Sequence, residues 1–281
     1  MSSPPQPPSA KPRGEPTKSK TKRAKAPSAN ERLKILAAGA AWLVGLRGAL
    51  IVLGMVLGSL PLPEVVLGAL IVDLGTGRAG LLWSSTELAR ADVLRVLGAG
   101  AGVGAGVAAL ALGVALAAGW GAAAPADMHM SALVALVPAA AVAIRDELLY
   151  RGVPLLFAAR AGIPTWAAVL FGALASPSAF IAATKPSPEA IVLAIANGAL
   201  FGALYVRTRG AWAAVGAHAA WAMVVDVAAR GGLFEIRWAN GELASGDMAV
   251  GGPAWVAAAI ALAAAAFVTL WRPRAFKPAA G

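Results

Sequence analysis

The sequence predicts an all-α fold, a polytopic transmembrane helical bundle of about eight spans. Of its 281 residues, 59% are hydrophobic and only 14% are charged, whereas a soluble domain carries about 25% charged residues. Mean hydropathy is +0.71. The apolar residues form continuous blocks rather than amphipathic stripes, and a block of roughly 20 residues is long enough to cross a bilayer as a helix. These features exclude an ordinary soluble globular domain.

Eight apolar blocks, bounded by Arg, Lys, Pro and Gly, are candidate spans. They lie at residues 35–58, 65–83, 93–120, 131–157, 165–183, 188–206, 211–229 and 254–271. The block at 65–83 contains Asp73 and Arg78, so it is either a span or an interfacial helix. Together the blocks form one transmembrane domain, residues 35–271, between a basic tail at 1–34 and a short basic tail at 272–281.

The distribution of basic residues predicts the orientation. Nine of the 24 Lys and Arg residues lie within 1–34. If this tail is cytosolic, the eight spans also bring Arg90, Arg160 and the C-terminal tail to the cytosolic side, as the positive-inside rule requires. The long connection at 231–252 then falls outside. We therefore expect a multi-pass protein of the cell (inner) membrane with both termini in the cytosol.

The tail at 1–34 is rich in Pro, Ser and Lys and has too few apolar residues to bury a core. We expect it to be disordered and to contact anionic lipid. It has no aromatic residue between its charges, which argues against nucleic-acid binding. The chain also has no cysteine, which excludes disulfides and thiolate metal sites.

The glycine-rich stretch "GAGAGVGAG", residues 98–106, superficially suggests a phosphate-binding loop. It does not match GxGxxG and follows no predicted strand. Gly98, Gly102 and Gly106 are spaced four residues apart, so we interpret them as a face of small residues for close helix packing.

The stretch "AIRDELLYRGVPLL", residues 143–156, places Arg145, Asp146, Glu147 and Arg151 inside an apolar block. Each ionisable group near a bilayer centre costs about 2.5–3.5 kcal/mol on insertion scales, so the cluster needs partners or a water-filled cavity. Glu147 and Arg151 are four residues apart and can pair on one helix face. Asp146 is turned about 100° from Glu147. A structural ion pair does not need this extra carboxylate, which indicates a functional site.

His218 is the only histidine inside a predicted span. It lies at about the depth of Asp146, in the cytosolic half, so we expect the two to share a site. The alternative is a histidine that is simply hydrogen-bonded to a neighbouring helix.

These stretches resemble the motifs of the type 2 CAAX prenyl proteases and bacteriocin-processing enzymes, also called the CPBP or ABI family of intramembrane proteases. The family carries EExxxRG on one helix, FxxxH on a later one and HxxxN or HxxxD on a third. "DELLYRG" matches the first motif with Asp leading, "LFGALAS" matches the position of the second, and "GALYVRTRGAWAAVGAH" resembles the approach to the third. The resemblance covers residues 131–229.

The resemblance implies that Asp146 activates a water, that Glu147 pairs with Arg151, and that His218 stabilises the oxyanion or transfers a proton. Two positions depart from the motifs, because Ala175 and Ala222 stand where the family has a histidine and an Asn or Asp.

Other polar residues do not align with these two positions. Asp226 lies eight residues after His218, roughly 12 Å farther along a helix, so it cannot replace the residue at 222. Ser176 and Asn197 are near the motifs in sequence, but we interpret both as interhelical polar contacts.

One histidine and two adjacent acids fall short of the three protein ligands of a catalytic zinc. We therefore expect a carboxylate-activated water and no metal or other cofactor. The predicted activity is that of an endopeptidase that cuts a peptide near the membrane. The substrate would be a prenylated C-terminus, a leader peptide or a C-terminal membrane anchor.

Two alternatives remain. The substitutions at Ala175 and Ala222 favour a membrane scaffold or regulator that has lost turnover. A small proton-coupled transporter would also use intramembrane acids, but the sequence has no detectable internal repeat.

Overall fold

The computed structural model describes residues 27–84, 89–126, 131–181 and 185–270. Within these ranges, helices occupy all eight segments predicted as spans, which confirms the all-α fold class. Most of the predicted tail at 1–34 and the whole tail at 272–281 lie outside the described residues.

The α-helices are, in chain order, α1 (Ala29–Leu57), α2 (Pro61–Arg78), α3 (Arg90–Ala117), α4 (Ser131–Val134), α5 (Leu136–Glu147), α6 (Val153–Ala161), α7 (Thr165–Ala175), α8 (Ser178–Ile181), α9 (Pro188–Thr208), α10 (Trp212–Ala222) and α11 (Gly251–Leu270). Two segments, η1 (Leu148–Gly152) and η2 (Met223–Ala228), are π-helical, and η3 (Gly246–Met248) is a 3-10 turn. Two short strands are β1 (Gly121–Pro125) and β2 (Phe234–Trp238).

Four of the described helices, α1, α3, α9 and α11, are long and apolar enough to cross a membrane. Thr165–Phe180 and Trp212–Ala228 are shorter apolar segments. The predicted span at 131–157 contains α4 and most of the continuous helical segment formed by α5, η1 and α6, which runs from Leu136 to Ala161. The chain is a membrane protein, and its count of eight spans is approximate.

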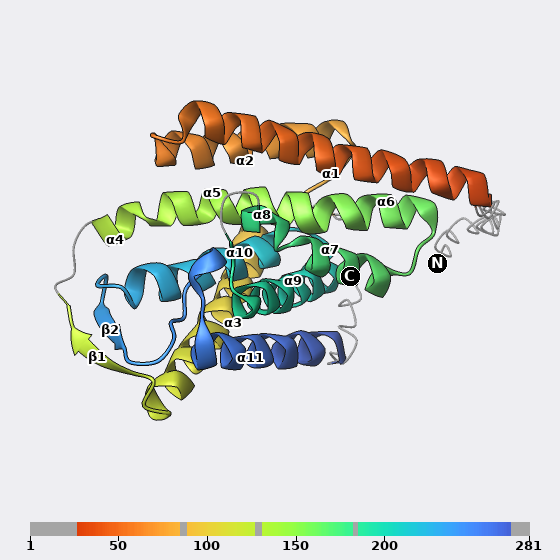
Figure 1. Ribbon diagram of the computed structural model, residues 1–281. Coiled ribbons are helices and arrows are strands. Elements are labelled where there is room, and N and C mark those ends of the chain that lie inside the picture. The colour runs from red at the N-terminus through yellow and green to blue at the C-terminus, as the bar shows by residue number, and fades with distance from the viewer. Residues whose placement is uncertain (1–26, 85–88, 127–130, 182–184, 271–281) are drawn as a thin grey trace, which may run out of the picture.

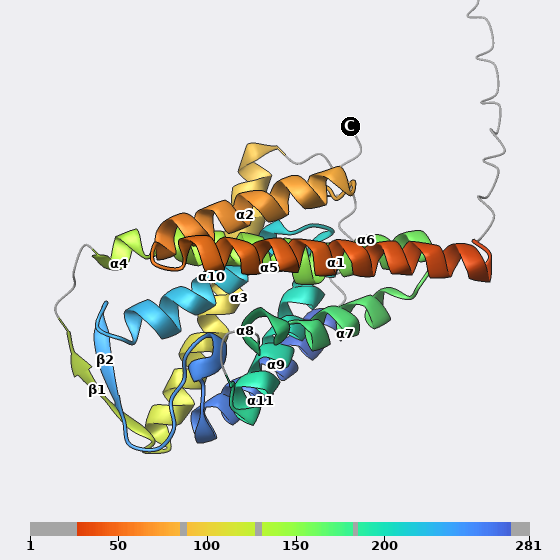
Figure 2. The same cartoon turned by 45° about the horizontal axis from the view of Figure 1, so that its top comes forward.

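The segment formed by α5, η1 and α6 runs through the middle of the bundle (Figure 1). Helices α1 and α2 cover one side of it, with α1 against α6 and α2 against α5. Helices α7, α9 and α10 contact this segment from the other side, and α3 crosses behind it in the turned view (Figure 2). Every residue of η1 is buried as a result.

Helix ends follow local capping rules. The α1 helix begins six residues before the predicted span because Ser28 and Glu31 form a capping box, in which each side chain accepts a hydrogen bond from the other's backbone amide. Ser187 caps α9 by accepting from the Ala190 amide at 3.0 Å. Gly162 ends α6 in the left-handed conformation, with φ of 67°.

The prediction that Gly98, Gly102 and Gly106 form the close-packing face is wrong. A Cβ added at any of these three would meet no atom of the described chain within 4 Å. The contact face is instead formed by Gly100 and Gly104, where an added Cβ would overlap the backbones of Ala213 and Ala217 in α10. The helix α3 therefore lies directly against the α10 backbone at Ala213 and at Ala217, the residue that precedes His218.

The two strands join connections that are far apart in sequence. Strand β1 pairs antiparallel with β2, from Gly121 opposite Trp238 to Pro125 opposite Phe234. At the other end of the bundle, Ser84 pairs with Gly210, and the Arg160 side chain donates to the Ala79 carbonyl at 2.8 Å. Each of these two sets of contacts joins segments that the predicted topology assigns to the same side of the membrane.

Candidate active site

The π-helical segment η1 follows directly after Asp146 and Glu147. Its hydrogen bonding shifts to a five-residue interval, as in the bond from the Val153 amide to the Leu148 carbonyl. Pro154 has no N–H to donate to Tyr150 four residues earlier, which favours a local departure from the α-helix. Such π-turns occur often at functional sites. Here the turn carries Arg151 back toward the two acids.

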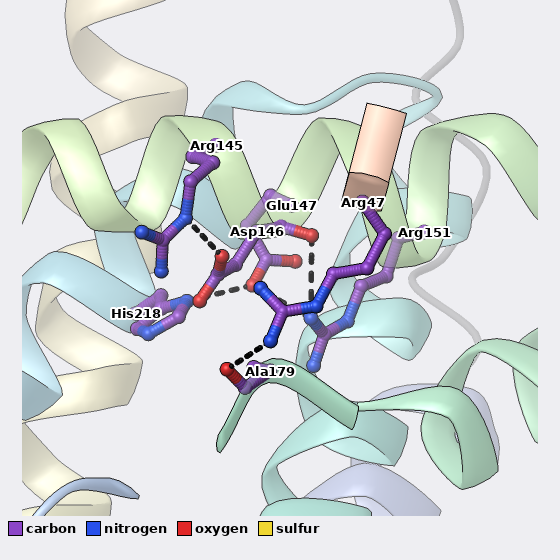
Figure 3. Close-up of polar contacts among 7 residues, drawn as sticks. All are labelled: Arg47, Arg145, Asp146, Glu147, Arg151, Ala179 and His218. Carbon is purple, nitrogen blue, oxygen red and sulfur yellow. Dashed lines mark hydrogen bonds and ion pairs between the residues drawn. The ribbon is translucent and has the colours of Figure 1, made fainter. Parts of the chain in front are cut away.

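Glu147 has no exposed surface and holds two basic partners (Figure 3). Its Oε1 lies 3.4 Å from Nη1 of Arg151 and 2.9 Å from Nδ1 of His218. The predicted pairing of Glu147 with Arg151 is confirmed. The second oxygen, Oε2, is buried and has no hydrogen-bond partner among the described residues.

Asp146 is held separately from Glu147. Its Oδ1 accepts a hydrogen bond from Nε of Arg145 at 2.7 Å (Figure 3). The Asp146 side chain retains 11% of its surface. Within the described chain its Oδ2 makes no hydrogen bond, so this oxygen is available to a water or substrate.

Phe201 of α9 orients the site without contributing a polar group. Its ring stacks on the His218 imidazole, with centroids 5.0 Å apart and planes inclined by 14°. On the same ring, Cζ of Arg151 lies 5.7 Å from the centroid. Sequence reasoning missed Phe201, because a phenylalanine in an apolar helix carries no signal that separates this role from packing.

These groups surround one cavity of about 300 Å³. Asp146, Arg145, Arg151 and His218 line it, whereas Glu147 lies behind the wall. The structure therefore brings together the four predicted site residues and Arg145, which belongs to the same charged stretch of the sequence. The two acids differ in their access to the cavity, because Asp146 lines it and Glu147 does not.

Ser176 and Asn197 also line this cavity, and Ser176 packs against α9, because a Cβ added at Gly198 would lie 2.6 Å from its Oγ. The interpretation of both as interhelical polar contacts stays a prediction. The Ser176 hydroxyl donates to the Gly172 carbonyl within its own helical segment, at 2.9 Å. Oδ1 of Asn197 is buried and has no hydrogen-bond partner in the described part of the chain. Ala175 and Ala222, which stand at the departing motif positions, do not line the cavity.

The rim of the cavity comes partly from the connection after β2. Ala244, Ser245 and Gly246 line the cavity, and the Ser245 amide donates to Oδ1 of Asp226 at 2.9 Å. Asp226 thus fixes this connection rather than joining the acids. The predicted topology puts this connection outside, and the placement of the site in the cytosolic half stays a prediction.

A second, smaller set of basic contacts adjoins the site. Arg47 of α1 donates through Nη2 to the Ala179 carbonyl at 2.8 Å (Figure 3). Arg47, Arg145, Ala179 and Glu64 line a neighbouring cavity of about 400 Å³. Helix α1 is thereby tied to the rim of the main cavity.

The segment that carries these residues is similar to a known protein family. Residues 128–224 match the Rce1-like family, described as type II CAAX prenyl endopeptidase, Rce1-like. The resemblance predicted from the motifs is confirmed over this segment. No curated protein and no solved structure matches the chain. An Rce1-like segment implies a protease acting on a peptide or protein substrate.

The Rce1-like segment contains every residue of the charged cluster, together with Asn197 and Phe201. It ends at residue 224, before Asp226 and the connection that bounds the cavity. Among the described residues, no group of three or more His, Cys, Asp and Glu is arranged to hold a metal ion.

Proposed function

We propose that this protein is an intramembrane endopeptidase in which the Asp146 carboxylate activates a water for attack on a peptide bond. The observation that carries the proposal is the unequal exposure of the two acids. Asp146 lines the cavity with one oxygen free of hydrogen bonds, whereas Glu147 is enclosed by Arg151 and His218. A general base must reach a water that also reaches the substrate, and of the two acids only Asp146 meets this condition.

In the proposed reaction, Oδ2 of Asp146 takes a proton from a water while the water oxygen bonds to the peptide carbonyl carbon. The carbonyl π electrons move to oxygen and form a tetrahedral oxyanion. Asp146 passes this proton to Nε2 of His218, whose Nδ1 faces Glu147, and the Nε2–H then stabilises the oxyanion or donates the proton to the leaving nitrogen. The oxyanion re-forms the C=O bond as the C–N bond breaks, which yields a carboxylic acid and an amine. The mechanism uses no metal or cofactor.

The charged groups of the site are held in fixed positions before the reaction begins. Arg145 holds Oδ1 of Asp146 and fixes the direction of the carboxylate. Glu147 holds the imidazole of His218 in place, and Arg151 balances the charge of Glu147. Fixed groups of this kind lower the barrier because they need no reorganisation when charge develops on the substrate.

The proposal is tested by a cleavage assay on the full-length protein in lipid nanodiscs. Three purified probes represent the candidate substrates: a farnesylated peptide ending in a CAAX sequence, a double-glycine leader peptide, and a peptide with a C-terminal membrane anchor. We expect the wild type to cleave at least one of them at a single bond, as read by mass spectrometry. A folded protein that leaves all three intact would contradict the proposal.

The alternative is a membrane scaffold that keeps the fold without turnover. It is favoured by Ala175 and Ala222, which remove two polar groups that the motifs carry. The same assay separates the two, because a scaffold leaves every probe intact while its thermal unfolding stays cooperative.

A further inference from the structure

Most of the buried polar atoms that lack a partner gather around one cavity. Among the described residues these atoms are Oε2 of Glu147, Nε of Arg151, Oδ1 of Asn197, the Tyr205 hydroxyl and the Ser245 hydroxyl. Arg151, Asn197 and Ser245 line the active cavity, and Glu147 lies directly behind its wall. Folded proteins leave few such atoms unpaired, and each is expected to meet a water or a ligand.

Asn197 belongs to the face of α9 that meets the catalytic groups. Leu193, Asn197 and Phe201 are spaced four residues apart and all line the cavity. Phe201, one turn beyond Asn197, carries the stacked His218 ring. The adjacent residue, Gly198, permits close packing, because an added Cβ would lie 2.6 Å from Oγ of Ser176 and 3.2 Å from Nη2 of Arg151. Asn197 is therefore one helical turn from Phe201, whose ring stacks on His218, and lines the same cavity.

Ser245 reaches the cavity from the connection after β2, and this connection is anchored at several points. Its backbone amide is bound by Asp226. Leu243 and Ala244 before it are buried, and the Ser187 hydroxyl donates to the Ala249 carbonyl at 2.8 Å. The Ser245 hydroxyl is thus held in position, although it makes no hydrogen bond to a described residue.

We propose that Asn197 and Ser245 form a subsite that binds the main chain of the peptide substrate. A carboxamide offers one acceptor and a pair of donors, which match the C=O and N–H of a peptide unit, and a serine hydroxyl both donates and accepts. No charge is present on either group, which suits a neutral main chain rather than an acidic or basic side chain. The inference rests on the proposed protease function and adds two substrate-contacting residues to it.

Loss of a subsite should change catalysis and leave stability intact. Asn197→Ala should raise KM and lower kcat/KM by at least about tenfold, and Ser245→Ala should act in the same direction. Because each change removes an unpaired buried polar atom, the thermal unfolding temperature should stay equal or rise. The matched control is Thr269→Ala in α11, whose hydroxyl is bound to the Ala265 carbonyl of its own helix and which does not line the active cavity, and it should leave kcat/KM within about twofold.

The decisive experiment tests whether Asn197 contacts a main-chain amide of the substrate peptide. The probe peptide that the wild type cleaves is N-methylated at one amide at a time around the scissile bond. We expect one position at which N-methylation lowers kcat/KM of the wild type about tenfold but has no further effect in Asn197→Ala. Equal sensitivity of the two proteins at every position would overturn the subsite, as would a lowered unfolding temperature of Asn197→Ala with unchanged kinetics.

Failure of the protease proposal is recognised separately, because the wild type would then cleave no probe. In that case the same peptides are titrated against the wild type and Asn197→Ala by fluorescence anisotropy. Weaker binding by the variant supports the subsite, and equal binding overturns it.

Discussion

Glu147 and His218 are 71 residues apart in sequence and share a contact of 2.9 Å between Oε1 and Nδ1. The carboxylate has no exposed surface, and the imidazole retains 17% of its own. This contact joins the helix that carries both acids, α5, to α10, which packs directly against it. It gives the imidazole a fixed orientation, with its second nitrogen left for the substrate.

Replacement of His218 should therefore affect turnover more than folding. We expect His218→Ala to lower kcat by a factor of about 10² to 10³, since one group that stabilises the oxyanion or transfers a proton is lost. Folding should survive because Arg151 still balances Glu147. Steady-state kinetics and thermal unfolding of the same preparation check this. An unfolded variant, or one with normal kcat, would argue against this role.

Arg151 should matter first for stability. Arg151→Ala removes a partner of a carboxylate with no exposed surface, and breaking a buried pair costs about 3–5 kcal/mol. We expect poor accumulation in the membrane and a lowered unfolding temperature. The double variant Arg151→Ala with Glu147→Gln should recover part of the loss, because the uncompensated charge is gone. If the double variant is no more stable than the single one, the pairing argument fails.

The glycine contact between α3 and α10 offers a matched pair of substitutions. Gly104→Ala would press a methyl group into the Ala217 backbone, and overpacking of this kind costs about 1–3 kcal/mol. The displacement should also move His218 and lower kcat. Gly102→Ala faces open space and should be neutral or slightly stabilising, since alanine is the better helix former. Equal stability of the two variants would refute the assigned packing face.

Asp226 should act on the site only through the connection it anchors. Asp226→Ala removes the acceptor of the Ser245 amide, and a hydrogen bond to a charged group contributes about 1.5–3 kcal/mol. We expect faster limited proteolysis between residues 239 and 250 and a raised KM. Asp226→Asn keeps an oxygen acceptor and should retain most of the protection. A proteolysis rate that is the same in Asp226→Ala and wild type would contradict the anchoring role.

The sequence located the helices and the principal charges of the site. Apolar blocks predicted all eight helical segments, the spacing of Glu147 and Arg151 predicted their contact, and the depth of His218 predicted its place near the acids. These features depend on local spacing or on the energetic cost of ionisable groups in a bilayer, so a single sequence contains them.

Features that depend on which way a helix faces were not predictable. The helix α3 is apolar on all sides, so no polar stripe shows whether Gly102 or Gly104 meets a neighbour. The contact of Phe201 with His218, the anchoring of Arg47 to Ala179, and the return of Ser245 to the cavity all join segments distant in sequence. Only the folded arrangement determines them.

The central claim, that Asp146 activates the water, is tested most directly by the rate of peptide cleavage in Asp146→Asn. An amide cannot accept the proton, but its size and its acceptor for Arg145 remain, and the Arg145 side chain retains 19% of its surface. The unfolding temperature should therefore fall less than in Arg151→Ala, and the variant should stay folded. We expect cleavage to be abolished in Asp146→Asn and to be retained or raised in Asp146→Glu, which keeps a carboxylate and restores the usual residue of the EExxxRG motif. Cleavage by a folded Asp146→Asn variant at the wild-type rate would contradict the account.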